Sequence, residues 1–136
     1  MKPPRVLLVD DTPEILALCL EVLRPNFEIV GAITDGHSAL AVVSTTTPDV
    51  VVLDIAMPGL DGLEVARRLR SAGCQAAIVF FSVDMDFMTA DVEFMAAALE
   101  AGGAGFVAKR LLAVDLPRAI REAVDGRMFV SDSQLL

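Results

Sequence analysis

Several charged and polar side chains in this sequence come directly after apolar stretches. Asp10 and Asp11 follow the first stretch, Asp54 follows another, and Ser82 and Lys109 each follow one further along the chain. Clustered carboxylates repel one another and raise each other's pKa unless a cation lies among them. Because these side chains offer oxygen ligands, the expected cation is hard, and Mg²⁺ is the prediction.

The apolar stretches alternate with segments of helical periodicity, which is typical of βα units and a parallel sheet. Strands are predicted over 5–9, 27–32, 50–53, 77–81 and 106–108, and helices over 12–23, 37–45, 63–72, 89–101 and 115–126. Asp115 is predicted to cap the last helix. The fold class is therefore α/β, a doubly wound five-stranded parallel sheet flanked by five helices. In such a sheet ligands bind beyond the carboxyl ends of the strands, which would gather the polar side chains into one site.

Composition narrows the possible functions. With 136 residues, the chain is predicted to be one domain over 1–136, with 127–136 as a linker or tail. A net charge of −8 and only 11 lysines and arginines argue against direct nucleic-acid binding. The sequence contains no apolar run of membrane-spanning length and no signal peptide, so a cytoplasmic location and no membrane association are expected. Cys19 and Cys74 are predicted to be small buried apolar residues.

The order and spacing of these residues resemble a known family. The sequence LDIAMPGLDG over 53–62, the acidic pair after the first strand, Ser82 after the fourth, and GGAGF over 102–106 before Lys109 resemble the receiver domain of bacterial two-component response regulators. The likeness covers nearly the whole chain and implies a flavodoxin-like (βα)5 fold. Residues 114–131 resemble the end of receivers that carry a helix-turn-helix output domain.

The resemblance implies a phosphorelay signalling switch. Asp54 would be the nucleophile that takes a phosphoryl group from a sensor histidine kinase or a phosphotransfer protein. Asp10, Asp11 and Asp54, with the backbone carbonyl of Ala56, would hold Mg²⁺, whose charge screens the repulsion between a carboxylate and a phosphoryl group. The protein would be a phosphoacceptor with at most slow self-dephosphorylation, and it would not be a metabolic enzyme.

By the same resemblance, Lys109 would contact a phosphoryl oxygen and Ser82 would donate a hydrogen bond to the phosphoryl group. Capturing these side chains would bias a loop and helix between two packings. Phe106 lies where the family carries a rotating aromatic, on the face made by the fourth helix, fifth strand and fifth helix. A plain core aromatic is an equally good interpretation of Phe106.

The region before Lys109 departs from the family pattern. Ser82 and Lys109 are 27 positions apart, a longer span than is usual, and the extra residues fall within 83–101. Val83 follows the switch hydroxyl where a very small residue is usual, and it would narrow access to the phosphoryl site. These features favour a second hypothesis, a pseudo-receiver that docks partners without phosphorylation.

A third hypothesis is a phosphatase with an aspartate nucleophile. Such an enzyme needs a second aspartate two residues after the nucleophile, and that position is Ala56. Self-association is also predicted, either through the face of the fourth helix, fifth strand and fifth helix or through the first helix. In the first helix, the residues expected to face the sheet are Ile15, Cys19, Val22 and Leu23. That would leave Leu16 and Leu20, together with Leu18, as an exposed apolar flank.

Overall fold

The computed structural model describes residues 2–83 and 92–131. The strands are β1 (Arg5–Val9), β2 (Glu28–Ile33), β3 (Val50–Asp54), β4 (Ala77–Ser82), β5 (Gly103–Ala108) and β6 (Phe129–Val130). The helices are α1 (Pro13–Leu23), α2 (Gly36–Thr46), α3 (Gly62–Ser71), α4 (Val92–Glu100) and α5 (Leu112–Val124), with a 3₁₀ turn, η1 (Lys109–Leu111), before α5. None of the helices in this described part has the length and apolar character needed to cross a membrane.

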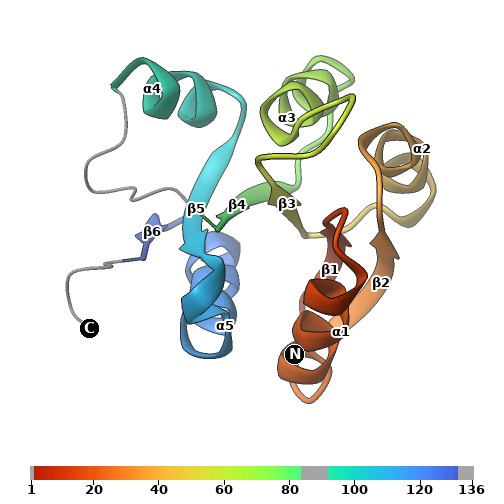
Figure 1. Ribbon diagram of the computed structural model, residues 1–136, viewed down its shortest axis with the longest axis vertical. Helices are drawn as coiled ribbons and strands as arrows, with labels where there is room; N and C mark the ends of the chain where they lie inside the picture. The colour runs from red at the N-terminus through yellow and green to blue at the C-terminus, as the bar shows by residue number, and fades with distance from the viewer. Residues whose placement is uncertain (1, 84–91, 132–136) are drawn as a thin grey trace.

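The strands form one sheet in the order β2-β1-β3-β4-β5-β6, and every neighbouring pair is parallel (Figure 1). The α/β parallel sheet is confirmed, but the count of five strands is wrong. The sixth strand, β6, lies in the stretch 127–136 that the sequence predicts as a linker or tail. Two residues cannot show the alternation that identifies a strand, and β6 exists because it pairs with the edge of β5.

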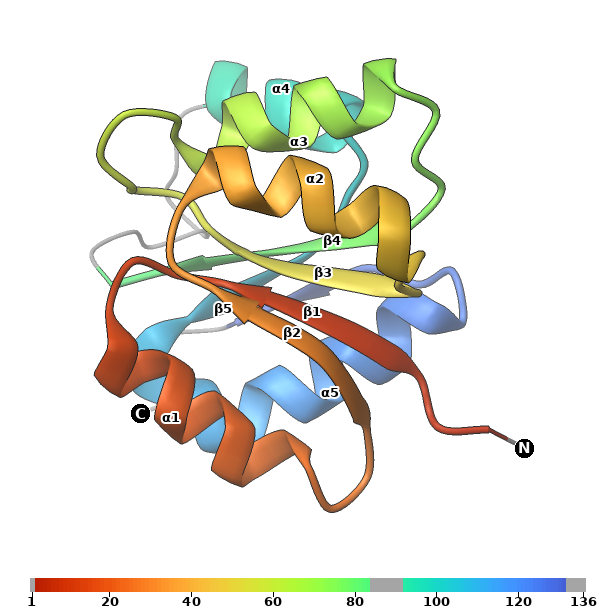
Figure 2. The same ribbon diagram turned by 90° about the vertical axis from the view of Figure 1, so that its right-hand side faces the viewer.

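Helices cover both faces of the sheet. Helices α2, α3 and α4 pack on one face, and α1 and α5 pack on the other (Figure 2). Neighbouring residues of each central strand point to opposite faces, so Leu53 joins the α2–α3–α4 cluster while Val52 joins the α1–α5 cluster. Burial on both faces explains why these strands are continuously apolar.

Two aspartates begin helices on the α2–α3 side. Asp35 and Asp61 accept hydrogen bonds from the backbone N–H groups of Ser38 and Glu64, at 2.8 and 2.9 Å, and so cap α2 and α3. Gly62, the first residue of α3, packs directly against the end of β3. A Cβ atom placed there would lie 2.1 Å from the carbonyl oxygen of Asp54, so only glycine allows this approach.

The last helix begins earlier than the sequence predicts. Helix α5 starts at Leu112, and Asp115 lies inside its first turn, so the prediction that Asp115 caps the helix is wrong. Leu112 and Leu116 are both buried against the α1–α5 side of the sheet. Their burial extends the helix toward η1, and Pro117 consequently lies inside the helix, where it removes one backbone hydrogen bond.

The predicted orientation of the first helix is also incorrect in part. Cys19 and Leu23 face the sheet as expected, but Leu16 is buried with them, while Leu20 is half-buried and packs on the same cluster. The buried stripe therefore runs through Leu16, and the exposed flank of Leu16 and Leu20 does not exist. Leu18 is the large apolar side chain that α1 exposes.

The fourth helix is described from Val92, and the predicted start near residue 89 lies outside the described residues. The same holds for most of the lengthened segment within 83–101, since residues 84–91 are not described. Cys19 is buried as predicted, but Cys74 is only half-buried.

Candidate functional site

The sheet topology brings the predicted site residues to one edge. β1 and β4 flank β3, so Asp10, directly after β1, lies beside the end of β3 at Asp54. In the β4–β5 pair, Ser82 is the partner of Ala108, which precedes Lys109. The carboxyl ends of four neighbouring parallel strands therefore carry the polar side chains, as expected for a ligand site in an open α/β sheet.

Two of the carboxylates are fixed by their own turns. Asp10 Oδ1 accepts a hydrogen bond of 2.8 Å from the backbone N–H of Thr12, and Asp54 Oδ1 accepts one of 3.1 Å from that of Ala56. Aspartate favours such contacts two residues ahead in turns. Each side chain thus uses one oxygen for its turn and directs the other, Oδ2, toward Lys109.

Lys109 is the cation between these carboxylates. Its Nζ atom lies 2.6 Å from Asp10 Oδ2 and 3.2 Å from Asp54 Oδ2, and all three side chains are buried. The same Nζ lies 5.3 Å from the centre of the Phe81 ring. Buried charges are tolerated only when opposite charges lie close enough to offset the cost of removing them from water. Here a single ammonium faces two carboxylates.

The charge balance shifts the pKa values of the site. Burial, and then the negative charge of Asp10, raise the pKa of Asp54 from its usual 3.8 to about 6, although Lys109 acts in the opposite direction. Burial also disfavours the charged form of Lys109. Its hydrogen bond and charge interaction with Asp10, followed by those with Asp54, outweigh this effect, and the pKa of Lys109 is raised. The single positive charge of Lys109 therefore faces the carboxylates of Asp10, Asp11 and Asp54, and negative charge is in excess.

Asp10, Asp11 and Asp54 meet as a group that fits a metal ion. One carboxylate oxygen from each lies within 4.8 Å of the others, with Asp11 exposed and the other two buried. Asp10 Oδ2 is buried and lies 2.6 Å from the Lys109 ammonium. An all-oxygen donor set with one side open to solvent suits Mg²⁺, which keeps several waters when it binds.

The residues predicted for switching lie in two environments. Ser82 is buried at the end of β4, whereas Val83 is 63% exposed. Phe106 is fully buried, pairs with Phe80 in the sheet, and stacks on its ring with 5.7 Å between centroids. The aromatic side chain of Phe106 is a core residue in this structure, packed in the cluster that includes Ala98 of α4.

Sequence reasoning missed a polar network next to the site. Ser131 Oγ accepts a hydrogen bond from the N–H of Ala108, and its hydroxyl donates to Asp115. Ser131 and Asp115 are 16 positions apart and form no motif, and each has an ordinary local explanation as a tail hydroxyl or a helix cap. No signal in the sequence joins them.

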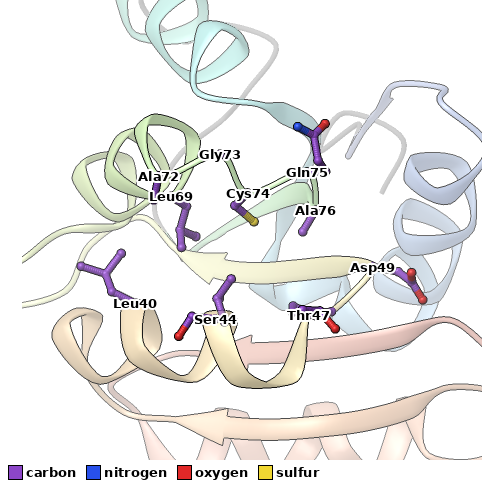
Figure 3. Close-up of a pocket in the computed structure, with 12 residues that line it drawn as sticks. Leu40, Ser44, Thr47, Asp49, Leu69, Ala72, Gly73, Cys74, Gln75 and Ala76 are labelled. Atoms are coloured by element: carbon purple, nitrogen blue, oxygen red, sulfur yellow. The ribbon is translucent and has the colours of Figure 1, made fainter.

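A hollow of about 510 Å³ lies at the other end of the sheet (Figure 3). It is bounded by α2, α3 and the segments that lead into β3 and β4, with Leu40, Leu69 and Cys74 among its lining side chains. Asp49 and Ala76 mark the amino ends of β3 and β4, so this hollow is separated from Asp54 by the length of β3.

Comparison with known proteins agrees with this geometry. The model of the response regulator receiver domain matches residues 6–121. The chain is 30% identical to the nitrate/nitrite response regulator protein NarL of Escherichia coli K12, over 97% of this chain and 60% of that protein. It is also 39% identical to a protein-glutamate methylesterase/protein-glutamine glutaminase of a Nocardioides species, over 91% of this chain and 34% of that protein.

Solved structures give the same result. The signal receiver domain of the response regulator NarL from Mycobacterium tuberculosis matches with a TM-score of 0.81 at 29% identity, over 93% of this chain and all of that one. A LuxR-family two-component response regulator from an Aurantimonas species matches with a TM-score of 0.84 at 29% identity, over 98% and 93% of the two chains. The chain therefore belongs to the response regulator receiver domain family.

Proposed function

We propose that Asp54 is the phosphoacceptor of this receiver domain. The observation that carries the proposal is the buried Lys109 ammonium between Asp10 and Asp54, beside a cluster of three carboxylates. In the reaction, an Asp54 oxygen attacks the phosphorus of a phosphohistidine, the P–N bond breaks, and the imidazole leaves with a proton. The product is an acyl phosphate on Asp54.

Mg²⁺ would supply positive charge that screens the attacking carboxylate from the phosphoryl oxygens. Asp10, Asp11 and Asp54, with the carbonyl of Ala56, are the residues proposed to hold it. Lys109 contacts the carboxylate of Asp54, and this contact supports the proposal that its ammonium neutralises a phosphoryl oxygen there. The turn at Ala56 holds Asp54 in one orientation, which reduces the entropy lost on reaching the transition state.

Ser82 and Phe106 are the proposed switch. Phosphorylation adds nearly two negative charges and three acceptor oxygens. A hydrogen bond from Ser82 to the phosphoryl group would move the end of β4 toward Asp54. Phe106 stacks on Phe80, which belongs to the same strand β4. The movement would therefore change the packing of the face made by α4, β5 and α5. Val83 is proposed to affect how fast donors and water reach Asp54.

The wider setting is also a proposal. Receiver domains interact with histidine kinases or phosphotransfer proteins, and we take one of these as the donor. The chain spans about 60% of the length of its E. coli relative. We expect one domain, a cytoplasmic location, no direct contact with nucleic acid, and no enzymatic activity beyond slow self-dephosphorylation.

Dimerisation is proposed through the α4–β5–α5 face. Val92 and Leu99 on α4 and Val114 on α5 are exposed apolar side chains, and such surface often marks an interface. On α1, Leu18 alone provides a much smaller exposed apolar surface. In sedimentation experiments the substitution Leu99→Glu should weaken any dimer, whereas Leu18→Glu should leave it unchanged. A dimer that is weakened by Leu18→Glu would assign the interface to α1.

The test of the proposed function is phosphorylation by acetyl phosphate with and without Mg²⁺, read by intact mass. The wild type should gain one adduct of about 80 Da only with the metal. Asp54→Asn should gain none. Asp61→Asn removes an exposed helix-capping carboxylate and is the matched control that should behave as the wild type.

Failure of the wild type to gain an adduct would refute the proposal. If Mg²⁺ also fails to bind, the outcome supports the pseudo-receiver that only docks partners. If Mg²⁺ binds normally, the outcome points to restricted access to Asp54 at Val83.

A further inference from the structure

The residues after α5 form a buried network directly before Lys109. Ser131 Oγ accepts a hydrogen bond of 3.1 Å from the backbone N–H of Ala108, and the same hydroxyl donates one of 2.7 Å to Asp115 Oδ2. The backbone N–H of Ser131 donates a third, of 2.8 Å, to the carbonyl of Phe106. Ser131 is 2% exposed and Asp115 is 8% exposed.

The hydrogen bonds of this network leave Ser131 few alternative positions. The hydroxyl of Ser131 both accepts and donates, so removing it leaves a buried N–H and a buried carboxylate without that partner. Leaving buried polar groups unsatisfied costs more than the net value of the hydrogen bond itself. The three hydrogen bonds therefore hold Ser131 in one place relative to β5 and α5.

The segment that carries Lys109 is held from both edges. On one side, Ala108 pairs with Ser82 of β4. On the other side, Ser131 binds the N–H of Ala108. Lys109 is the next residue, and its ammonium must reach Asp10 at 2.6 Å and Asp54 at 3.2 Å. A shift of the backbone at Ala108 would move the ammonium away from both carboxylates.

The rest of the C-terminal segment supports the placement of Ser131. Phe129 and Val130 are half-buried, and they pair with β5 as β6. The guanidinium of Arg118 on α5 lies 5.3 Å from the centre of the Phe129 ring. The backbone N–H of Arg127 donates to the carbonyl of Glu122 at 2.8 Å, which turns the chain back toward the sheet after α5.

We propose that Asp115 and Ser131 are positioning residues for Lys109. They act by fixing the backbone at Ala108, and β6 thereby becomes part of the phosphorylation centre. The proposal rests on the proposed function of Lys109 at Asp54. Coupling of this kind is reciprocal, so a change in the contacts of Lys109 on phosphorylation must alter the docking of β6 by the same free energy.

The lysine content of the chain allows a direct test. Lys2 and Lys109 are the only lysines, so selective ¹⁵N-lysine labelling gives at most two ammonium signals in an NMR spectrum. The Lys109 signal reports the buried ion pair, and Lys2, which is exposed, is the internal control. This measurement does not depend on phosphorylation.

The variants are Ser131→Ala, which removes the hydroxyl, and the pair Asp115→Ala and Asp115→Asn. The asparagine keeps an oxygen that can accept from the Ser131 hydroxyl. Val43→Ala on α2 is the stability control, because it removes buried apolar contacts on the opposite face of the sheet. If Ser131→Ala does not fold, the Asp115 pair makes the same comparison.

Ser131→Ala and Asp115→Ala should shift and broaden the Lys109 signal. They should also slow phosphoryl uptake from acetyl phosphate by at least about fivefold, since small displacements of a catalytic group have large effects on rate. Mg²⁺ binding should be retained or tightened, because a displaced ammonium competes less for the carboxylates. Asp115→Asn and Val43→Ala should keep the wild-type signal and rate. General loss of structure would instead weaken Mg²⁺ binding.

The inference is overturned if Ser131→Ala and Asp115→Ala keep the Lys109 signal and the wild-type rate, or if Val43→Ala slows uptake equally. Wild-type protein that takes up no phosphoryl group would refute the proposed function alone. The NMR comparison would then still decide whether the network positions Lys109.

Discussion

Replacing Asp54 by asparagine should stabilise the metal-free protein at neutral pH. The raised pKa of Asp54 means that the folded protein holds its proton up to about pH 6, whereas the unfolded chain releases it near 3.8. Between these values the folded state binds more protons than the unfolded state, so stability falls as pH rises. Above about pH 6 the full cost of the ionised carboxylate is present, and asparagine removes it.

The magnitude follows from the shift. A change from 3.8 to about 6 corresponds to roughly 3 kcal/mol at pH 7.5, by about 1.4 kcal/mol for each pH unit. The amide nitrogen of asparagine facing the Lys109 ammonium should offset part of this gain. About 2 kcal/mol remains, which for a chain of this length raises Tm by roughly 6–10 °C. Near pH 4 the gain should disappear, because the carboxyl of the folded wild type is then protonated.

Thermal unfolding with EDTA, followed by circular dichroism at pH 4 and pH 7.5, measures both values. Asp35→Asn is the control. The backbone N–H of Ser38 holds the pKa of Asp35 below its usual range, so its stabilising effect is lost as pH falls, the opposite trend. Added Mg²⁺ should raise the Tm of the wild type more than that of Asp54→Asn, because the metal binds the folded carboxylates. A lower Tm for Asp54→Asn in EDTA at pH 7.5 would refute the reasoning.

Three further outcomes are expected. Gly62→Ala should destabilise the protein by about 3 kcal/mol in urea unfolding, because its Cβ would meet the carbonyl of Asp54 at 2.1 Å; unchanged stability would show that α3 can move away from β3. Phe106→Ala should cost about 3–5 kcal/mol in the same assay, since the ring is fully buried, and a cost below about 1 kcal/mol would contradict the core packing. Burial raises the pKa of the Cys19 thiol to about 12, so a thiol reagent at pH 8 should label the half-buried Cys74 first; modification of two thiols at equal rates in the folded protein would contradict this.

Some features of this protein are present in the sequence alone. Each central strand is buried on both faces, which requires a continuous apolar run, and these runs mark β1, β3 and β4 without reference to any contact. The polar residues that end the runs could then be assigned to one edge, because parallel strands place their carboxyl ends together. The meeting of Asp10, Asp11 and Asp54 follows from that rule.

Other features depend on contacts between distant segments. Whether Asp115 caps α5 or binds Ser131 is decided by the burial of Leu112, which extends the helix, and by the chain that folds back as β6. The orientation of α1 with Leu16 inward is chosen by packing against the sheet, since its apolar residues fit more than one stripe. The tertiary structure also sets the pKa of Asp54, because burial and the distances to Asp10 and Lys109 determine the cost of its charge. The sequence determined which side chains reach the site, and the folded structure determined which atoms meet there, because hydrogen bonds and charge interactions depend on distances that only packing fixes.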